Sequence, residues 1–162
     1  MNAANYALDA LDVRLLERLQ ADANQTYEEL GHRIGLSATA VLRRVRRLRK
    51  AGVIQGEVAV LEPGKVGAGL TAIVQVSLRN EVANNRGFGQ RLAAHPAVSQ
   101  CYYVTGSADF VFIAHFPAIA DFQEFAERYL DRNKSVRRFV TQIVLRSDKR
   151  SLRVPIMPPS GR

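Results

Sequence analysis

The sequence predicts an α+β chain in two parts, an N-terminal group of three helices and a C-terminal domain of βαββαβ order. Three observations support this prediction. Apolar residues recur at helical spacing before Gly52, they alternate with polar residues after Gly69, and a stretch rich in proline and glycine separates the two patterns. The predicted division is a first domain at residues 1–61, a linker at 62–69, a second domain at 70–150 and a tail at 151–162.

The first two helices are recognised by spacing and by capping residues. Leucines recur at helical spacing between Leu8 and Leu19, with charged residues on the other side. A short polar break follows. Thr26 then begins the second helix, and Glu29 stands three residues later, as in a capping box. Gly35 is expected to end this helix.

The third helix is predicted to start at Ser37, which is a suitable N-cap, and to end at Gly52. The second and third helices are joined by a tight turn that contains glycine, which makes a helix-turn-helix arrangement. The segment 53–61 is predicted to be extended and to supply a small wing, so the domain is interpreted as a winged helix-turn-helix. The residues expected on the buried stripe of the third helix are Val41, Val45 and Leu48.

After the linker, the pattern predicts four strands and two helices in split-βαβ or ferredoxin-like order. The last residues contain three prolines, and we expect this tail to be partly disordered beyond the last strand. The expected elements are a strand at 71–78, a helix at 84–95, strands at 98–105 and 109–116, a helix at 119–129 and a strand at 136–145.

Composition restricts the class of protein. The chain has 23 Lys+Arg against 15 Asp+Glu, a net charge of +8 and a pI near 10.2, which favours a polyanionic partner. The single cysteine, Cys101, excludes an intramolecular disulfide and a cysteine-cluster metal site. No secretory signal and no apolar stretch of roughly 20 residues is present, so we expect a soluble cytoplasmic protein without a membrane partner.

No pattern of catalytic or metal-binding residues is found. The three histidines are far apart in the sequence and lack the spacing of metal ligands. The linker has neither the order of a P-loop nor the glycines of a dinucleotide-binding fingerprint. We therefore predict no catalytic residue, no metal and no cofactor, and we expect that the protein is not an enzyme.

The third helix carries the strongest functional signal. Six of the eight residues from Arg43 to Lys50 are cationic, and the first turn has only small or hydroxylated side chains. Such a helix suits insertion into a major groove, because small residues allow close approach to base edges and arginines contact phosphates. A solvated basic face is the alternative interpretation. The residues predicted to contact double-stranded DNA are Ser37, Ala38, Thr39, Ala40, Arg43, Arg44, Arg46 and Arg47.

These features resemble the Lrp/AsnC family of regulators, over roughly residues 8–150. The resemblance in the first domain lies in Leu11-Asp12, in Leu36-Ser37 and in the ending Arg44, Leu48, Gly52, Val53, Ile54. In the second domain it lies in Pro96-x-Val98, in Val104-Thr105-Gly106-x-x-Asp109 and in Thr141-x-Ile143-Val144-Leu145. The resemblance implies a homodimer formed through the βαββαβ domain, which in the family often assembles further into a tetramer or octamer. It also implies pseudo-palindromic DNA and a small effector such as an amino acid.

The turn between the two middle strands is the candidate effector site. Gly106 permits close approach of a ligand, successive amides can receive a carboxylate, and Asp109 can pair with an ammonium group. Glycine and aspartate are also common in turns for structural reasons alone. The resemblance places the effector near this turn, at the interface between protomers. The residues predicted to bind it are Val104, Thr105, Gly106, Asp109, Thr141 and Gln142.

Three functions follow from these observations. The first is a sequence-specific DNA-binding transcription regulator modulated by a small effector. The second is an architectural DNA-binding protein that senses nothing. An enzyme is the third, because ferredoxin-like domains also host catalysis, but no nucleophile–base pair supports it.

Overall fold

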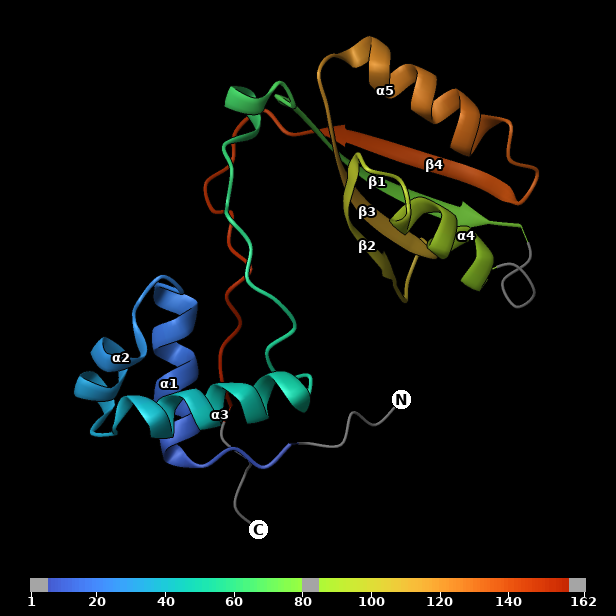
Figure 1. Ribbon diagram of the computed structural model, residues 1–162. Helices are drawn as coiled ribbons and strands as arrows, with labels where there is room; N and C mark the ends of the chain where they lie inside the picture. The colour runs from blue at the N-terminus through green and yellow to red at the C-terminus, as the bar shows by residue number, and fades with distance from the viewer. Residues whose placement is uncertain (1–5, 80–84, 158–162) are drawn as a thin grey trace. The chain divides into compact units, whose positions relative to one another are not determined.

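The computed structural model describes residues 6–79 and 85–157, and the chain forms two compact units. A helical unit holds the chain up to Ala59 together with the segment from Arg150 onward, and a sheet unit holds Val60–Lys149. The chain therefore leaves the helical unit once and rejoins it after the last strand. Figure 1 follows this course from blue to red.

Three helices form the N-terminal part of the helical unit, as the sequence predicts. They are α1 (Ala10–Ala21), α2 (Tyr27–Ile34) and α3 (Ala38–Lys50). In each, the N-cap side chain accepts a hydrogen bond from a backbone N–H of the first turn, which would otherwise lack a partner. The predicted box of Thr26 and Glu29 is confirmed. A second box, which the sequence analysis missed, joins Asp9 and Asp12 at the start of α1.

Two glycines permit the tight turn between α2 and α3. Gly35 has φ +79°, a left-handed conformation that side chains disfavour, and it ends α2 as predicted. Gly31 is required for a different reason: a Cβ atom there would lie 2.4 Å from the carbonyl oxygen of Leu36. The three helices enclose a core of seven buried aliphatic residues, including the predicted stripe on α3: Leu15, Leu16, Leu30, Ile34, Val41, Val45 and Leu48.

The predicted wing is not a strand. Residues 53–61 follow α3 without entering a β-ladder, and the described part of the helical unit contains no strand at all. A strand needs a hydrogen-bonded neighbour, which this unit does not supply.

The tail contacts the helical unit, although the sequence led us to expect partial disorder there. The side chain of Gln20 on α1 forms two hydrogen bonds with the backbone of Val154: its Nε2 donates to the carbonyl at 3.0 Å, and its Oε1 accepts from the N–H at 2.8 Å. Ile156 packs against the core of the same unit. These contacts order residues that have no secondary structure of their own.

The sheet unit has the predicted βαββαβ order. Its four strands pair antiparallel in the order β2-β3-β1-β4. A short 3₁₀ helix at Pro63–Val66 occupies the predicted linker, and the π-helical turn Glu127–Asp131 continues α5. The elements are β1 (Leu70–Leu78), α4 (Asn85–Ala93), β2 (Val98–Tyr103), β3 (Phe110–Phe116), α5 (Ile119–Ala126) and β4 (Val136–Ile143). Residue 84, where the predicted helix starts, lies outside the described residues.

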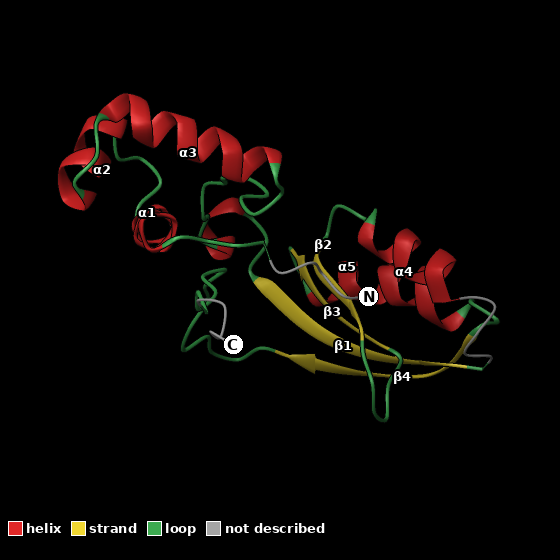
Figure 2. Cartoon of the chain, turned by 90° about the horizontal axis from the view of Figure 1, so that it is seen from below, coloured by secondary structure: helices red, strands yellow, loops and turns green. Residues whose placement is uncertain are grey.

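The two faces of the sheet differ. Both helices lie on one face (Figure 2), where alternate residues of β1 and β3 are buried against them. No described element of the sheet unit covers the other face. It carries apolar side chains that are half-buried or exposed: Ile73, Val111, Ile113 and Val140. Such a face is typical of a sheet that packs against a second sheet.

Candidate nucleic-acid interface and effector site

The first turn of α3 presents small side chains at the surface. Ser37 and Thr39 are exposed, while Ala38 and Ala40 are half-buried. The hydroxyl of Ser37 accepts the N–H of Ala40 at 3.2 Å, so it caps the helix and is already engaged. The hydroxyl of Thr39 is on the outside of the helix, opposite the buried stripe, where it is available to a ligand.

The arginines of α3 fall into two classes. Arg44 and Arg47 bind acidic residues of α1: Arg44 Nη1 lies 2.6 Å from Asp9 Oδ2 and 2.8 Å from Asp12 Oδ1, and Arg47 Nη2 lies 2.5 Å from Asp12 Oδ2. The side chain of Asp12 is entirely buried, with 0% exposure. We call Asp9, Asp12, Arg44 and Arg47 the ion network. It joins α1 to α3 inside one chain.

In the ion network, the guanidinium groups of Arg44 and Arg47 form ion pairs within the protein. The hydrogen bond from Arg44 holds the pKa of the Asp9 carboxyl below its usual value, with the Asp12 amide contributing next. The same contacts, first with Asp9 and then with Asp12, raise the pKa of Arg44. Buried carboxylates are almost always paired in this way, because an unpaired charge away from water is costly. Arg44 and Arg47 therefore have a structural role before any DNA is bound.

The second class consists of Arg43, Arg46 and the neighbouring Lys50. At 100° per residue, these three cations and the uncharged Thr39 lie on the side of α3 opposite the buried residues, and we call the four residues the outward stripe. All four are exposed. Within the described residues, no carboxylate lies within ion-pair distance of Arg43, Arg46 or Lys50. Their charges are available to a polyanion.

Lys50 was absent from the residues predicted to contact DNA. The signal that identifies it was present in the sequence, because Lys50 follows Thr39 by eleven residues, or three helical turns. The preceding residue, Arg49, lies to one side of the stripe and pairs with Glu57 at 2.5 Å.

The 104–109 turn is closed by backbone and side-chain hydrogen bonds. The N–H of Val104 donates to the carbonyl of Asp109 at 2.8 Å, and the hydroxyl of Ser77 on β1 donates to the carbonyl of Ser107 at 3.0 Å. Gly106 has φ +113°, and a Cβ atom there would meet nothing within 4 Å. The turn is thus anchored at its base and open at its tip.

Asp109 has a structural partner. Its Oδ2 accepts the backbone N–H of Leu78 at 2.7 Å, where the pairing of β1 with β4 shifts register between Ser77 and Leu78. The pairing of β1 with β3 ends at Val76 and Phe110, so Leu78 lies beyond the last pair, and the carboxylate of Asp109 supplies an acceptor for its amide. This contact explains an aspartate at this position without any effector.

The two predicted residues on β4 point to opposite faces of the sheet. Thr141 pairs with the buried Val74, and its hydroxyl oxygen is buried without a hydrogen-bond partner. Gln142 pairs with Ile73 and is exposed. Because successive side chains of a strand alternate between faces, one ligand on one face cannot contact both side chains. A sequence argument based on this alternation would have separated them.

The described residues contain no group of three or more His, Cys, Asp or Glu side chains placed to hold a metal ion. No helix among those same residues is both long enough and apolar enough to cross a membrane. Two of the histidines have ordinary partners: His115 lies 3.1 Å from the hydroxyls of Thr71 and Ser99, and His95 accepts the N–H of Ala97 at 3.2 Å.

Two family models match the chain. The one described as the AsnC-type helix-turn-helix domain matches residues 8–49, and the one described as the Lrp/AsnC ligand binding domain matches residues 71–154. The two matches fall in the helical unit and mainly in the sheet unit, respectively.

Individual proteins match over nearly the whole chain. An uncharacterised HTH-type transcriptional regulator of Sinorhizobium fredii is 39% identical over 151 residues, covering 92% of this chain and 89% of its own length. A leucine-responsive regulatory protein of Rhizobium meliloti is 37% identical over 150 residues, covering 92% and 96%. The solved structure of a transcriptional regulator of Neisseria meningitidis in complex with L-methionine superimposes with a TM-score of 0.84 at 31% identity, covering 92% of this chain and 97% of that one.

Proposed function

The chain belongs to the Lrp/AsnC family of transcriptional regulators, and from this membership we propose that α3 contacts DNA through the outward stripe. The protein is a DNA-binding transcription regulator with a ligand-binding domain. In this proposal Thr39 and the small residues of the first turn approach base edges, while Arg43, Arg46 and Lys50 neutralise phosphates.

One observation supports this assignment above the others: the ion network occupies Arg44 and Arg47. Eight residues were predicted to contact DNA, and the presence of arginine at these two positions is already explained by their ion pairs within the chain. Arg43 and Arg46 have no such explanation, because no carboxylate of the described residues pairs with them. A DNA backbone would supply the missing negative charge.

We further propose a homodimer formed through the uncovered face of the sheet. This face exposes Val140 and leaves Ile73, Val111 and Ile113 half-buried. A two-fold dimer would carry two copies of α3 to major grooves about 34 Å apart. Assembly into a tetramer or octamer, a cytoplasmic location and the absence of enzymatic activity belong to the same proposal.

The effector proposal concerns the 104–109 turn. Its open tip at Gly106 and its amides suit the carboxylate of an amino acid, and the neighbour from Neisseria meningitidis was solved with L-methionine. Asp109 would receive the ammonium group through the oxygen that does not accept the Leu78 amide. Thr141 has a buried hydroxyl without a partner and remains a candidate, whereas Gln142 would act from the opposite face.

An architectural role without an effector is the second candidate. The contact between Asp109 and Leu78 favours the architectural role, because this contact alone explains why residue 109 is an aspartate. A thermal-shift screen of the full chain with the twenty amino acids separates the two candidates. Concentration-dependent stabilisation by at least one amino acid is expected if the turn binds an effector, and no shift from any of them favours the architectural role.

The DNA interface is tested with the double variant Arg43→Ala/Arg46→Ala, on DNA selected by the wild-type protein from a random library. We expect affinity to fall at least about tenfold near physiological salt, and the slope of log K against log salt to shrink by about two, because two phosphate contacts are lost. The matched control is Arg18→Ala/Arg86→Ala, which removes the same charge from exposed positions outside α3.

The control is expected to keep the wild-type salt slope. Equal losses in the two double variants would mean that only net charge matters, and the outward stripe would then be the wrong interface. Thr39→Val should change the preferred base sequence more than the salt slope, since Thr39 carries no charge.

A further inference from the structure

The last strand of the sheet has a β-bulge opposite Ser77 of β1. In the pairing of β1 with β4, Ser77 pairs with Arg138 but Leu78 pairs with Val136, so one extra residue, Arg137, is left on β4. A bulge of this kind places two residues of one strand opposite a single residue of its partner. We call Arg137 and Arg138 the bulge arginines.

Both bulge arginines point away from the helices. They are flanked by Val136 and Phe139, which pack in the apolar core between the sheet and its helices. Neighbouring side chains of a strand alternate between faces, so an arginine that follows or precedes a core residue is turned toward the uncovered face. A regular strand has one residue between two core positions, whereas the bulge has two. The bulge therefore places two adjacent cations on the uncovered face, and both are exposed.

The bulge is joined to the 104–109 turn through β1. Ser77, the ladder partner of Arg138, donates its hydroxyl to the carbonyl of Ser107 at 3.0 Å. The next residue, Leu78, donates its N–H to Asp109 Oδ2 at 2.7 Å. Figure 2 shows the turn between β2 and β3 extending from the sheet on the side away from the helices. The turn and the bulge arginines therefore border the same part of the uncovered face, with only β1 between them.

The charge of this region is not balanced within the described residues. No carboxylate of that part of the chain lies within ion-pair distance of Arg137 or Arg138. The turn has one carboxylate, that of Asp109. A third arginine, Arg79, donates its Nε to the carbonyl of Val136 at 3.2 Å, beside the bulge. Burial of unpaired cations under a second copy of the chain would be costly, so an anion is expected beside the bulge arginines when that face is occupied.

We propose that the effector of the 104–109 turn is an acidic amino acid, aspartate or glutamate, whose side-chain carboxylate is bound by the bulge arginines. This rests on the effector proposal above, in which the amides of the turn receive the α-carboxylate and Asp109 receives the ammonium group. The bulge arginines then remain for a second carboxylate, which a guanidinium group binds through charge-assisted hydrogen bonds. A ligand with net negative charge also complements the cationic excess of the region better than a neutral amino acid does.

The spacing of the strands is compatible with this arrangement. Neighbouring strands lie about 5 Å apart, so the backbone of β4 is about 10 Å from that of β3, where the turn ends. A long arginine side chain on β4 and the side chain of the ligand bridge this distance from its two ends. The apolar side chain of a leucine or a methionine would leave both guanidinium groups without a partner.

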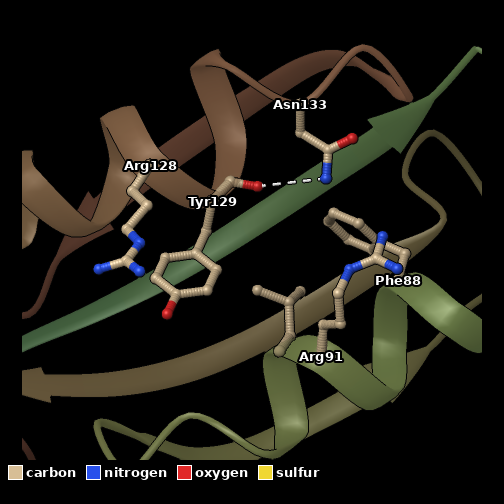
Figure 3. Close-up of a pocket in the computed structure, with 6 residues that line it drawn as sticks. Phe88, Arg91, Arg128, Tyr129 and Asn133 are labelled. Atoms are coloured by element: carbon tan, nitrogen blue, oxygen red, sulfur yellow. Dashed lines mark hydrogen bonds between the residues drawn. The ribbon is translucent and has the colours of Figure 1, made fainter.

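The test compares two pairs of probes that have nearly the same shape and differ in charge, L-glutamate with L-glutamine and L-aspartate with L-asparagine. Each probe is titrated into the full chain by calorimetry, with L-leucine as an apolar reference. The test variant is Arg137→Gln/Arg138→Gln. The matched control is Arg91→Gln/Arg128→Gln, which removes the same charge from exposed positions on the helix-covered side, where Figure 3 shows the two arginines on either side of Tyr129.

We expect one of the acidic amino acids to bind the wild-type protein at least about tenfold more tightly than its amide does. This preference should be lost in the test variant, because the α groups still bind the turn but the second carboxylate has no partner. The control should keep the preference. The proposal is overturned if an amide or leucine binds the wild-type protein as tightly as the acidic amino acids do, or if the test variant keeps the preference.

Two outcomes separate this proposal from the one on which it rests. If a neutral amino acid binds best and loses affinity in Asp109→Asn, the effector site stands and only the acidic class is wrong. If no amino acid binds, both proposals are overturned. Should the test variant fail to fold by far-UV circular dichroism, Arg137→Lys/Arg138→Lys keeps both charges and should keep the preference for the acidic amino acid, and a loss of that preference would contradict the proposal.

Discussion

The helical unit and the sheet unit are stabilised by different kinds of contact. The helical unit has a core of seven buried aliphatic side chains, and beside it lies the ion network around Asp12. The sheet unit buries fifteen apolar residues, six of which are phenylalanine, and its described ion pairs are on the surface. The small helical core is thus supplemented by buried charge, whereas the larger core of the sheet unit is apolar.

This difference determines how function and stability are distributed. In the helical unit both depend on α3, where Arg44 and Arg47 face α1 and Arg43 and Arg46 face outward. If α3 contacts DNA as proposed, an arginine substitution there affects either folding or DNA binding, according to its position around the helix. In the sheet unit the 104–109 turn lies outside the apolar core, so a substitution in this turn should leave that core intact.

The largest expected effect is in the ion network. Arg44→Ala/Arg47→Ala leaves the carboxylate of Asp12 buried without a cation, which should destabilise the helical unit by about 3–5 kcal/mol. Amide hydrogen exchange of the full chain is the measurement. Protection in α1 and α3 should fall by this amount, while protection in β1 and β3 is retained.

Adding Asp12→Asn to this double variant is the control. It removes the buried charge but keeps an oxygen that can still accept the Asp9 amide. Part of the lost protection should return. If the triple variant is less stable than the double variant, the unpaired charge is not the cause, and the comparison between the two units would have to be revised.

Features that depend on neighbours in sequence could be predicted, and features that depend on distant contacts could not. The cap formed by Thr26 and Glu29, the end of α2 at Gly35 and the alternation of β3 are all local patterns. The ion network joins residues 32 and 35 positions apart, and nothing in the sequence indicates which arginines of a basic helix will face an aspartate. The predicted DNA interface therefore did not separate Arg44 and Arg47, which pair with acidic residues of α1, from the other arginines of α3.

The candidate effector site follows the same rule. The 104–109 turn was predicted because its glycine and aspartate are only three residues apart, but the contact between Asp109 and Leu78 spans 31 positions and was missed.

A smaller effect is expected at Asp109 in the sheet unit. Asp109→Ala removes the acceptor of the Leu78 amide, and loss of one hydrogen bond to a charged group should cost about 1.5–3 kcal/mol. Asp109→Asn keeps an oxygen acceptor and should cost less. Chemical denaturation measures both variants. An effector whose ammonium group pairs with the Asp109 carboxylate should lose affinity in both variants. If effector binding is lost only in the less stable Ala variant, the role of Asp109 is structural.

The contact of the tail with α1 should contribute less still. Gln20→Ala removes two exposed hydrogen bonds to Val154, and we expect a loss of about 1 kcal/mol or less from the helical unit. Limited proteolysis should then cut the segment from Arg150 to Met157 faster. Gln20→Glu retains the acceptor but not the donor, so its cleavage rate should be intermediate. Equal rates in all three proteins would mean that Ile156 alone holds the tail.

The smallest effect is a pH dependence that concerns only the sheet unit. Burial, and secondarily the charge of Arg128, lowers the pKa of His95 below the ordinary 6.5. Neutral His95 accepts the amide of Ala97 at Nδ1, which protonation would prevent. The unfolded chain therefore binds a proton at higher pH than the folded chain does. Neutral His95 makes its full contribution to stability above pH 6.5. This contribution is lost as the pH falls from there through the lowered pKa of His95 in the folded state.

Urea denaturation of the sheet unit between about pH 8 and about pH 5 should show this loss, because histidine changes charge within that interval. His95→Gln does not titrate and should flatten the dependence, whereas His32→Gln, exposed on α2 in the helical unit, should leave it unchanged. The dependence should also be confined to β1–β3 exchange protection and absent from α1 and α3. An equal decline in both units would mean that His95 is not the cause. The lowered pKa of Asp9 cannot produce such a decline, because it makes the helical unit lose stability only as the pH falls below the usual aspartate range, outside this interval.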